Sequence, residues 1–197
     1  MENNYSFFAM MSRMKYIERW ALMRNTRQEN ISEHCLEVSM IAHGLAVIAN
    51  KRFHKNVNEQ KAALIGLYHD APEIITGDMP TPIKYYNSEM KGAYKEVEAV
   101  ACKRLLNMLP EDIRTEYESL FFVSEGEEYL WKIVKAADKI SAYIKCIEEM
   151  NSGNGEFKSA KKTLLCAIEN MHMEEVDVFM NEFMPSYGKT LDELQNM

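Results

Sequence analysis

The chain has 197 residues, a formal net charge of −7 and a sequence pI of about 5.4. Proteins that bind long nucleic acids need a basic stripe, because most of their affinity comes from neutralising phosphates, and this sequence has none. Hydrophobic residues make up 47%, enough for a sizeable core, while only 8 glycines and 5 prolines favour long helices over short strands. We expect a single domain spanning residues 1–197, with no long nucleic acid as a partner.

Helical periodicity dominates the first half of the chain. Apolar residues recur every three or four positions over residues 6–17. Asn30 and Glu33 form a capping pair for a helix with one buried stripe, namely His34, Val38, Ile41, Leu45 and Ile48. A third helix is expected to start at Asn58, and its inner face carries Ala62, Ile65 and His69. Residues 76–82, Thr-Gly-Asp-Met-Pro-Thr-Pro, predict an ordered loop, because glycine and two prolines interrupt a helix.

The second half is also helical in pattern. Helices are predicted over residues 88–109, ended by Pro110, and over residues 111–120. Gly126 precedes a strong helix whose apolar stripe is Leu130, Ile133, Ala137, Ile140, Ile144 and Ile147. After a break at residues 151–155, one or two more helices are expected over residues 156–183. No segment predicts a strand, so the expected fold class is all-α, a bundle of roughly seven to nine helices.

The expected cellular location follows from the targeting and membrane signals that the sequence lacks. The first residues show no basic segment followed by an apolar stretch, so no signal peptide is expected. No apolar run approaches the roughly 18 residues of a membrane span. The four cysteines include no CxxC pair and are interpreted as free thiols. We expect a cytoplasmic protein with no membrane partner.

Four potential metal ligands lie on or beside apolar helix faces: His34, His69, Asp70 and Asp138. A carboxylate at the edge of a core is costly unless it has a cation or hydrogen-bond donors. Two imidazoles and two carboxylates brought together form a natural divalent-metal site that leaves positions for water and substrate. Mixed nitrogen and oxygen ligands of this kind suit cobalt, manganese, iron or zinc.

The order His…His-Asp…Asp on helices resembles the HD superfamily of metal-dependent phosphohydrolases. Four stretches are similar to the bacterial 5′-deoxynucleotidases of the YfbR type: Ile-Glu-Arg-Trp-Ala-Leu-Met-Arg-Asn, Glu-Asn-Ile-Ser-Glu-His, Tyr-His-Asp-Ala-Pro-Glu and Thr-Gly-Asp-Met-Pro-Thr-Pro-Ile-Lys-Tyr. The resemblance covers almost the whole chain and is weakest over residues 123–129 and in the last helices. Pro72 departs from the serine of the family pattern, at a position where a first helical turn tolerates proline.

The resemblance implies a single HD domain and a set of roles. The metal ligands would be His34, His69, Asp70 and Asp138. Glu73 would be the catalytic acid, and Arg19 and Trp20 would select and hold the nucleotide, with Arg19 also catalytic. The substrate pocket would be lined by the loop and by three of the metal ligands, namely Asp78, Met79, Pro80, Thr81, His34, Asp70 and Asp138. A preference for deoxyribose and a homodimer also come from the resemblance.

The number of histidines predicts one metal ion. HD proteins with two metals need further histidines after the His-Asp pair, and only His172 follows Asp70 in this chain. The three remaining histidines, His43, His54 and His172, are expected to be structural or exposed.

The reaction expected is hydrolysis of a nucleoside 5′-monophosphate to nucleoside and phosphate. Ile74 directly follows Glu73, where guanosine tetraphosphate hydrolases carry an acidic residue, and the Gly-Tyr-Pro signature of cyclic-dinucleotide phosphodiesterases is absent. Two alternatives stay open: an HD-type nucleoside triphosphate hydrolase, and a non-catalytic helical module that uses a metal only for stability. Purely structural explanations also exist for single residues, such as a turn role for Asp78.

Overall fold

The structure is a computed structural model that describes residues 5–84 and 86–195, apart from the side chains of residues 81 and 82. Its elements in chain order are α1 (Phe7–Met11), η1 (Ser12–Tyr16), α2 (Ile31–Phe53), α3 (Glu59–Tyr68), α4 (Glu73–Thr76), α5 (Thr81–Lys84), α6 (Ser88–Leu106), α7 (Glu111–Phe121), α8 (Glu128–Asn151), η2 (Gly155–Phe157), α9 (Lys158–Glu169), α10 (Glu174–Glu182), η3 (Met184–Gly188) and α11 (Leu191–Gln195).

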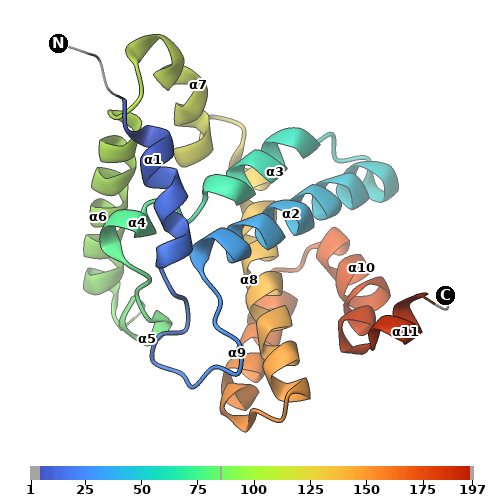
Figure 1. The fold of residues 1–197 in the computed structure, drawn as a ribbon. Coiled ribbons are helices and arrows are strands. Elements are labelled where there is room, and N and C mark those ends of the chain that lie inside the picture. Colours follow the sequence, from blue (N-terminus) through green and yellow to red (C-terminus); the bar gives the residue numbers. More distant parts are fainter. Residues whose placement is uncertain (1–4, 85, 196–197) are drawn as a thin grey trace.

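The all-α prediction is confirmed. Within the described residues, the only extended pairing is an isolated antiparallel bridge between Glu18 and Asn30. Seven helices of the described chain have nine residues or more, in line with the expected bundle. Figure 1 shows α2 and α3 side by side with α8 crossing them, and α2 also packs against α10.

Sequence patterns explain why α2 and α8 form the centre. Asn30 and Glu33 make the expected capping box, with Glu33 N–H donating to Asn30 Oδ1 at 3.1 Å. The predicted stripes of both helices are buried, and these are His34, Val38, Ile41, Leu45 and Ile48 on α2, and Leu130, Ile133, Ala137, Ile140, Ile144 and Ile147 on α8. These stripes meet in one hydrophobic core.

Gly66 sets the distance between α2 and α3. A Cβ atom added to Gly66 would lie 2.8 Å from Ser39 Cα, so only glycine allows the two backbones to come this close. The hydroxyl of Ser39 reaches across to donate to the Ala63 carbonyl at 2.8 Å. This tight contact brings the end of α3, and with it His69, beside α2.

Three local predictions differ from the structure. The helix predicted over residues 6–17 is α1 followed by the tighter turns of η1. The segment predicted as a loop over residues 76–82 contains the end of α4 and the start of α5. Proline suits a first helical turn, where its missing N–H has no intrahelical partner, so Pro82 is compatible with the first turn of α5, which begins at Thr81.

The third helix ends earlier than its periodicity indicates. Helix α3 stops at Tyr68, and Glu73 begins the separate helix α4, so Glu73 and His69 do not share one helix. Turns connect them, with Ala71 N–H donating to the Tyr68 carbonyl and Glu73 N–H to the Asp70 carbonyl. Pro72 lacks an N–H and its ring would clash with the carbonyl four residues earlier, which ends the helix.

Helix α2 is long and apolar enough to cross a membrane by length and composition alone. Half of its most apolar window is nevertheless buried inside the protein, against α3, α8 and α10. It is therefore a buried core helix.

Candidate metal and nucleotide site

The structure brings together the four predicted metal ligands from three parts of the chain. His34 comes from α2, His69 and Asp70 from the turn after α3, and Asp138 from α8. His34 Nε2 lies 3.5 Å from an Asp70 oxygen and 3.2 Å from an Asp138 oxygen. His69 Nε2 lies 3.2 Å from the same Asp70 oxygen and 4.0 Å from Asp138.

Both imidazoles are held with their Nε2 atoms facing the carboxylates. His34 Nδ1 lies 3.0 Å from the Ser141 hydroxyl, and His69 Nδ1 donates to the Gly66 carbonyl at 2.8 Å. The Gly66 carbonyl can only accept, so His69 Nδ1 carries a proton, and Nε2 is the ring atom that faces Asp70. The Cys35 sulfur, 3.6 Å from His69 Nδ1, packs against the same edge of the ring.

These residues fit a divalent metal ion. Ligand atoms of His34, His69 and Asp70 lie within 4.8 Å of one another. Among the described residues, buried His69 Nε2 makes no hydrogen bond, which is costly unless another group contacts this atom. Asp138 has 41% of its side chain exposed and forms the open side of the cluster. The arrangement leaves room for a further ligand from solution.

The charges around the cluster favour ionised carboxylates. Burial raises the pKa of Asp70, but the neighbouring His69 imidazole lowers it more, so the net pKa lies below its usual value. Burial lowers the pKa of His34, and the cation of Arg19 lowers it further. A neutral His34 beside an ionised Asp70 is the state that binds a metal.

Glu73 has a different environment from the carboxylates beside it. It is only 6% exposed, and its Oε2 atom is buried without a hydrogen-bond partner among the described residues. Burial, followed by the negative charges of Asp70 and Asp78, raises the pKa of Glu73 to about 9. Glu73 is therefore protonated at neutral pH in the metal-free protein and can donate a proton.

Arg19 and Trp20 lie next to the cluster and share one partner. Arg19 Nη1 and Trp20 Nε1 donate to the same oxygen of Glu29, at 2.7 and 3.0 Å. Burial lowers the pKa of Arg19, but the carboxylates around it, chiefly Glu29, raise it more, so its guanidinium keeps its charge. A charged guanidinium beside an indole can pair with a phosphate and pack against a sugar or base.

The backbone of Trp20 is strained and held in place. Its φ of 59° lies in the left-handed region, which a bulky residue seldom adopts. The Trp20 N–H donates to Asp78 Oδ2 at 3.3 Å, and the indole packs against Phe157 with ring centroids 5.3 Å apart. Asp78 thus ties the segment around Trp20 to the loop after α4.

The same segment is fixed at its far end to α8. Glu149, which is buried, accepts hydrogen bonds from the Thr26 backbone and hydroxyl, and it also pairs with Lys145. Lys145 in turn donates to the Arg27 carbonyl. Residues 19–27, called the braced segment below, are therefore held against α8, and Arg19 and Trp20 belong to this segment.

The remaining predicted pocket residues lie in or next to the loop between α4 and α5. Met79 and Pro80 are half-buried there, and the Pro80 carbonyl accepts from Ile83 N–H and Lys84 N–H at the start of α5. The side chain of Thr81 lies outside the described part of the chain. Contact of these three residues with a substrate stays a prediction.

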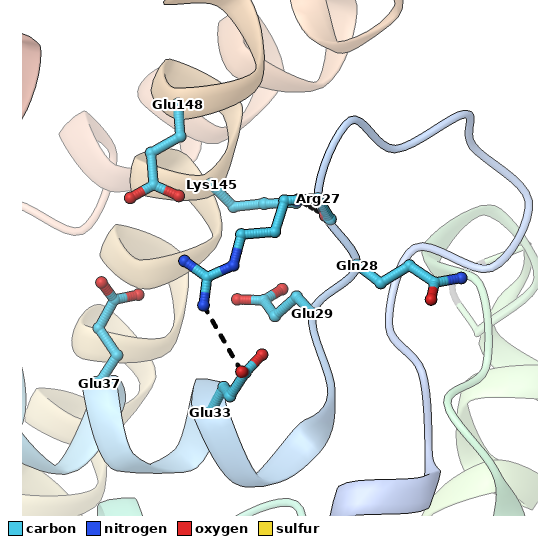
Figure 2. Close-up of a pocket in the computed structure, with 7 residues that line it drawn as sticks. All are labelled: Arg27, Gln28, Glu29, Glu33, Glu37, Lys145 and Glu148. Carbon is cyan, nitrogen blue, oxygen red and sulfur yellow. Dashed lines mark hydrogen bonds and ion pairs between the residues drawn. The ribbon is translucent and has the colours of Figure 1, made fainter. Parts of the chain in front are cut away.

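A cavity of about 160 Å³ lies behind the cluster, lined by Arg27, Gln28, Glu29, Glu33, Glu37, Lys145 and Glu148. Figure 2 shows the Arg27 side chain reaching between these carboxylates, where it pairs with Glu33 at 3.5 Å. Two of the lining residues connect directly to the site: Glu29 holds Arg19 and Trp20, and Glu37 accepts from the Ser141 hydroxyl at 2.5 Å.

Sequence reasoning missed three residues that bond to site residues on the side of this cavity. Glu29, Glu37 and Ser141 carry no signal in spacing or hydrophobic pattern that separates them from ordinary helix and loop residues. Only Glu29 stood inside a quoted motif, Glu-Asn-Ile-Ser-Glu-His. The expectation for the histidines outside the site is confirmed, since His43, His54 and His172 are all exposed.

Comparisons with known proteins agree with this geometry. The sequence pattern of the family described as "5'-deoxynucleotidase YfbR-like" matches residues 6–187. A 5′-deoxynucleotidase of Pectobacterium atrosepticum is 48% identical over 192 residues, which cover 98% of this chain and 96% of that protein. A 5′-deoxynucleotidase of Vibrio cholerae is 48% identical over 188 residues, covering 95% and 97%.

Solved structures show the same fold. An HD-domain phosphohydrolase from Listeria innocua superposes with a TM-score of 0.80 at 24% identity, covering 92% of this chain and 88% of that chain. A cyanophage S-2L HD phosphohydrolase, solved with dA and one catalytic Zn²⁺ ion, gives a TM-score of 0.65 at 22% identity, covering 92% and 96%. With a fold shared with HD-domain phosphohydrolases and a family match along most of its length, the chain belongs to the YfbR-like 5′-deoxynucleotidases.

Proposed function

We propose that this chain hydrolyses deoxynucleoside 5′-monophosphates to deoxynucleoside and phosphate, using one divalent metal ion held by His34, His69, Asp70 and Asp138. The observation that carries the proposal is the buried Nε2 of His69, which makes no hydrogen bond among the described residues and faces an Asp70 oxygen at 3.2 Å, as two ligands of one metal ion would. Membership of the 5′-deoxynucleotidase family supplies the reaction and the class of substrate.

When bound, a divalent ion would supply a Lewis acid for the phosphoryl group and would lower the pKa of a bound water. Arg19 would pair with the phosphoryl oxygens, because its guanidinium is charged and beside the cluster. Glu29 would hold that guanidinium in place during the reaction. Asp138, on the open side of the cluster, together with His34 and Asp70, would face the phosphate.

Glu73 would supply the proton that the leaving 5′-oxygen needs. A carboxyl group that is buried and protonated at neutral pH can act as a general acid directly or through one water molecule. Asp70 and Asp78 keep the Glu73 pKa high by repulsion, in addition to the effect of burial. The same environment makes Glu73 a poor metal ligand, so its role is distinct from that of the four ligands.

Trp20 would discriminate against a 2′-hydroxyl. An indole packed against the 2′-carbon leaves no room and no hydrogen-bond partner for that hydroxyl, and an apolar surface rejects an added hydroxyl by roughly 10². The two bonds that fix Trp20, to Glu29 and to Asp78, make the indole a rigid wall. The sugar preference is therefore expected to be finite.

A single metal ion is supported by the ligand set and by the one catalytic Zn²⁺ reported for the cyanophage phosphohydrolase. Cobalt, manganese, iron and zinc all suit two imidazoles and two carboxylates. A homodimer and a single domain over residues 1–197 are further parts of the proposal, and the mass of the protein in solution tests the first of them.

The experiment is a phosphate-release assay with a panel of nucleotides and metals. The panel contains matched nucleoside 5′-mono- and triphosphates, ribo and deoxy. Deoxynucleoside 3′-monophosphates are the control for the position of the phosphate. We expect release from deoxynucleoside 5′-monophosphates to exceed release from every other class. Preferred release from triphosphates would replace the proposal with a triphosphohydrolase, and no release with any metal would favour a non-catalytic metal site.

A further inference from the structure

A chain of hydrogen bonds extends from His34 away from the cluster. The Ser141 hydroxyl donates to Glu37 Oε2 at 2.5 Å, and Ser141 Oγ lies 3.0 Å from His34 Nδ1. Because its only proton points to the Glu37 carboxylate, the Ser141 hydroxyl can only accept from the ring. His34 must therefore carry its proton on Nδ1, which leaves a lone pair on Nε2 facing Asp70 and Asp138.

Burial makes this connection difficult to replace. His34 and Ser141 are both 0% exposed, so water has no access to either group of the His34–Ser141 pair. The residues come from two helices: His34 and Glu37 lie one turn apart on α2, and Ser141 comes from α8. Ser141 also lies one turn after Asp138 on α8, so that helix supplies both a predicted ligand and the group that orients another.

The outer end of the chain opens on the cavity of Figure 2. Glu37 lines this cavity with Glu148, and both carboxylates are seen on its wall. No bond joins Glu148 to Ser141 among the described hydrogen bonds, although it carries the same charge in the same cavity. The pair Glu37 and Glu148 thus separates the effect of a bond from the effect of a nearby charge.

We propose that Ser141 and Glu37 are positioning residues for the metal site, acting through His34. They fix its tautomer and ring orientation, and the Glu37 charge makes Nε2 a stronger ligand. This rests on the proposed metal site and concerns metal affinity, not the choice of substrate. Outer partners of metal-binding histidines typically change metal affinity by about 10–100-fold.

The first test measures the affinity of the metal-free protein for Zn²⁺ against a competing chelator. Ser141→Ala is expected to weaken binding by about 10–100-fold, and Glu37→Gln to weaken it by a smaller factor. The matched control, Glu148→Gln, is expected to bind as the wild type does. The double variant Ser141→Ala/Glu37→Gln should bind no more weakly than Ser141→Ala, because both changes break the same chain.

The second test reads the tautomer of His34 from imidazole ¹⁵N chemical shifts in the folded, metal-free protein. The wild type should show a protonated Nδ1, and Ser141→Ala should show a mixture of tautomers. Unchanged affinity and tautomer in Ser141→Ala would overturn the proposal, as would an equal effect of Glu148→Gln and Glu37→Gln. A protein that binds Zn²⁺ as described but releases no phosphate would contradict the proposed function alone.

Discussion

Acidic side chains that lie close together in this site have different properties because their contacts differ. Asp70 is beside two imidazoles and keeps its charge, whereas Glu73 is buried, has an oxygen without a hydrogen-bond partner among the described residues, and keeps its proton at neutral pH. Glu29 is bonded to a guanidinium and an indole, which fixes both. The same functional group thus suits three different proposed roles, namely metal ligand, proton donor and positioning residue.

Replacing Glu73 tests its assignment as the acid. Glu73→Gln should keep the metal, because Glu73 is not among the four proposed ligands, while kcat falls by about 10²–10⁴-fold. Kinetics with a deoxynucleoside 5′-monophosphate and metal analysis of the same sample provide the two measurements. Loss of the metal, or near-normal kcat, would show that the role is wrong.

The pH dependence of kcat tests whether Glu73 acts in its protonated form. Its pKa is raised to about 9, so the acid form is present below that pH and is lost as pH rises through it. A bound cation favours the Glu73 carboxylate, so the alkaline limb of the pH profile, where kcat falls, moves to lower pH. We expect wild-type kcat to fall on the alkaline side, and this limb to be absent from the residual activity of Glu73→Gln.

Trp20→Phe tests the link between Glu29 and sugar discrimination. The substitution keeps an aromatic ring against Phe157 but removes the N–H that donates to Glu29 at 3.0 Å. Losing such a bond costs about 1–2 kcal/mol, which corresponds to about 5–30-fold. We expect kcat/KM for the deoxy substrate to fall by that factor and the deoxy-to-ribo ratio to narrow. An unchanged ratio would remove Trp20 from discrimination.

At the scale of single residues, the sequence predicted the residues that form the candidate metal cluster but not the residues that hold them. His34 and His69 stood out because histidine on an apolar stripe is unusual. Ser141 and Glu37 are common residue types, and their pairing depends on how α2 crosses α8. A contact between helices about a hundred residues apart leaves no local pattern.

At the scale of elements, the approach of α3 to α2 determines where His69 lies. Gly66→Ala would put a methyl group 2.8 Å from the Ser39 Cα. The atoms in contact belong to helix backbones, which cannot move apart easily. Overpacking of this kind typically costs about 1–3 kcal/mol. We expect lower thermal stability and weaker metal binding in this variant.

Gly44→Ala is the matched control, because Gly44 also lies inside a helix but has open space around its added Cβ. That substitution should stabilise the protein by about 0.5–1 kcal/mol, since alanine favours a helix over glycine. Equal stability of both variants in thermal unfolding would contradict the close contact between α2 and α3.

Long elements were predicted well and short ones less so. The apolar stripes of α2 and α8 run for many turns, so periodicity identified them and their buried faces. Around residues 69–84 the chain makes turns and then two four-residue helices, α4 and α5, joined by a loop. Segments of four residues span little more than one helical turn, too few for a helical period to show, and a proline both ends α3 and lies in the first turn of α5.

At the scale of the whole molecule, the fold gathers the site from parts of the chain far apart in sequence. Helices α2 and α8 supply His34 and Asp138, the end of α3 supplies the His-Asp pair, and the braced segment before α2 supplies Arg19 and Trp20. Because each part is held by the common core, metal binding is expected to stabilise the entire bundle by mass action.

The most direct measurement of the central proposal is a metal titration of the chelated protein, followed by phosphate release from a deoxynucleoside 5′-monophosphate. Metal-free protein should be inactive, and activity should rise linearly and saturate at about one divalent ion per chain, as a mononuclear site requires. Asp138→Ala, titrated in parallel, should show neither tight binding nor activity. Full activity without metal would contradict the account, as would saturation only at two ions per chain.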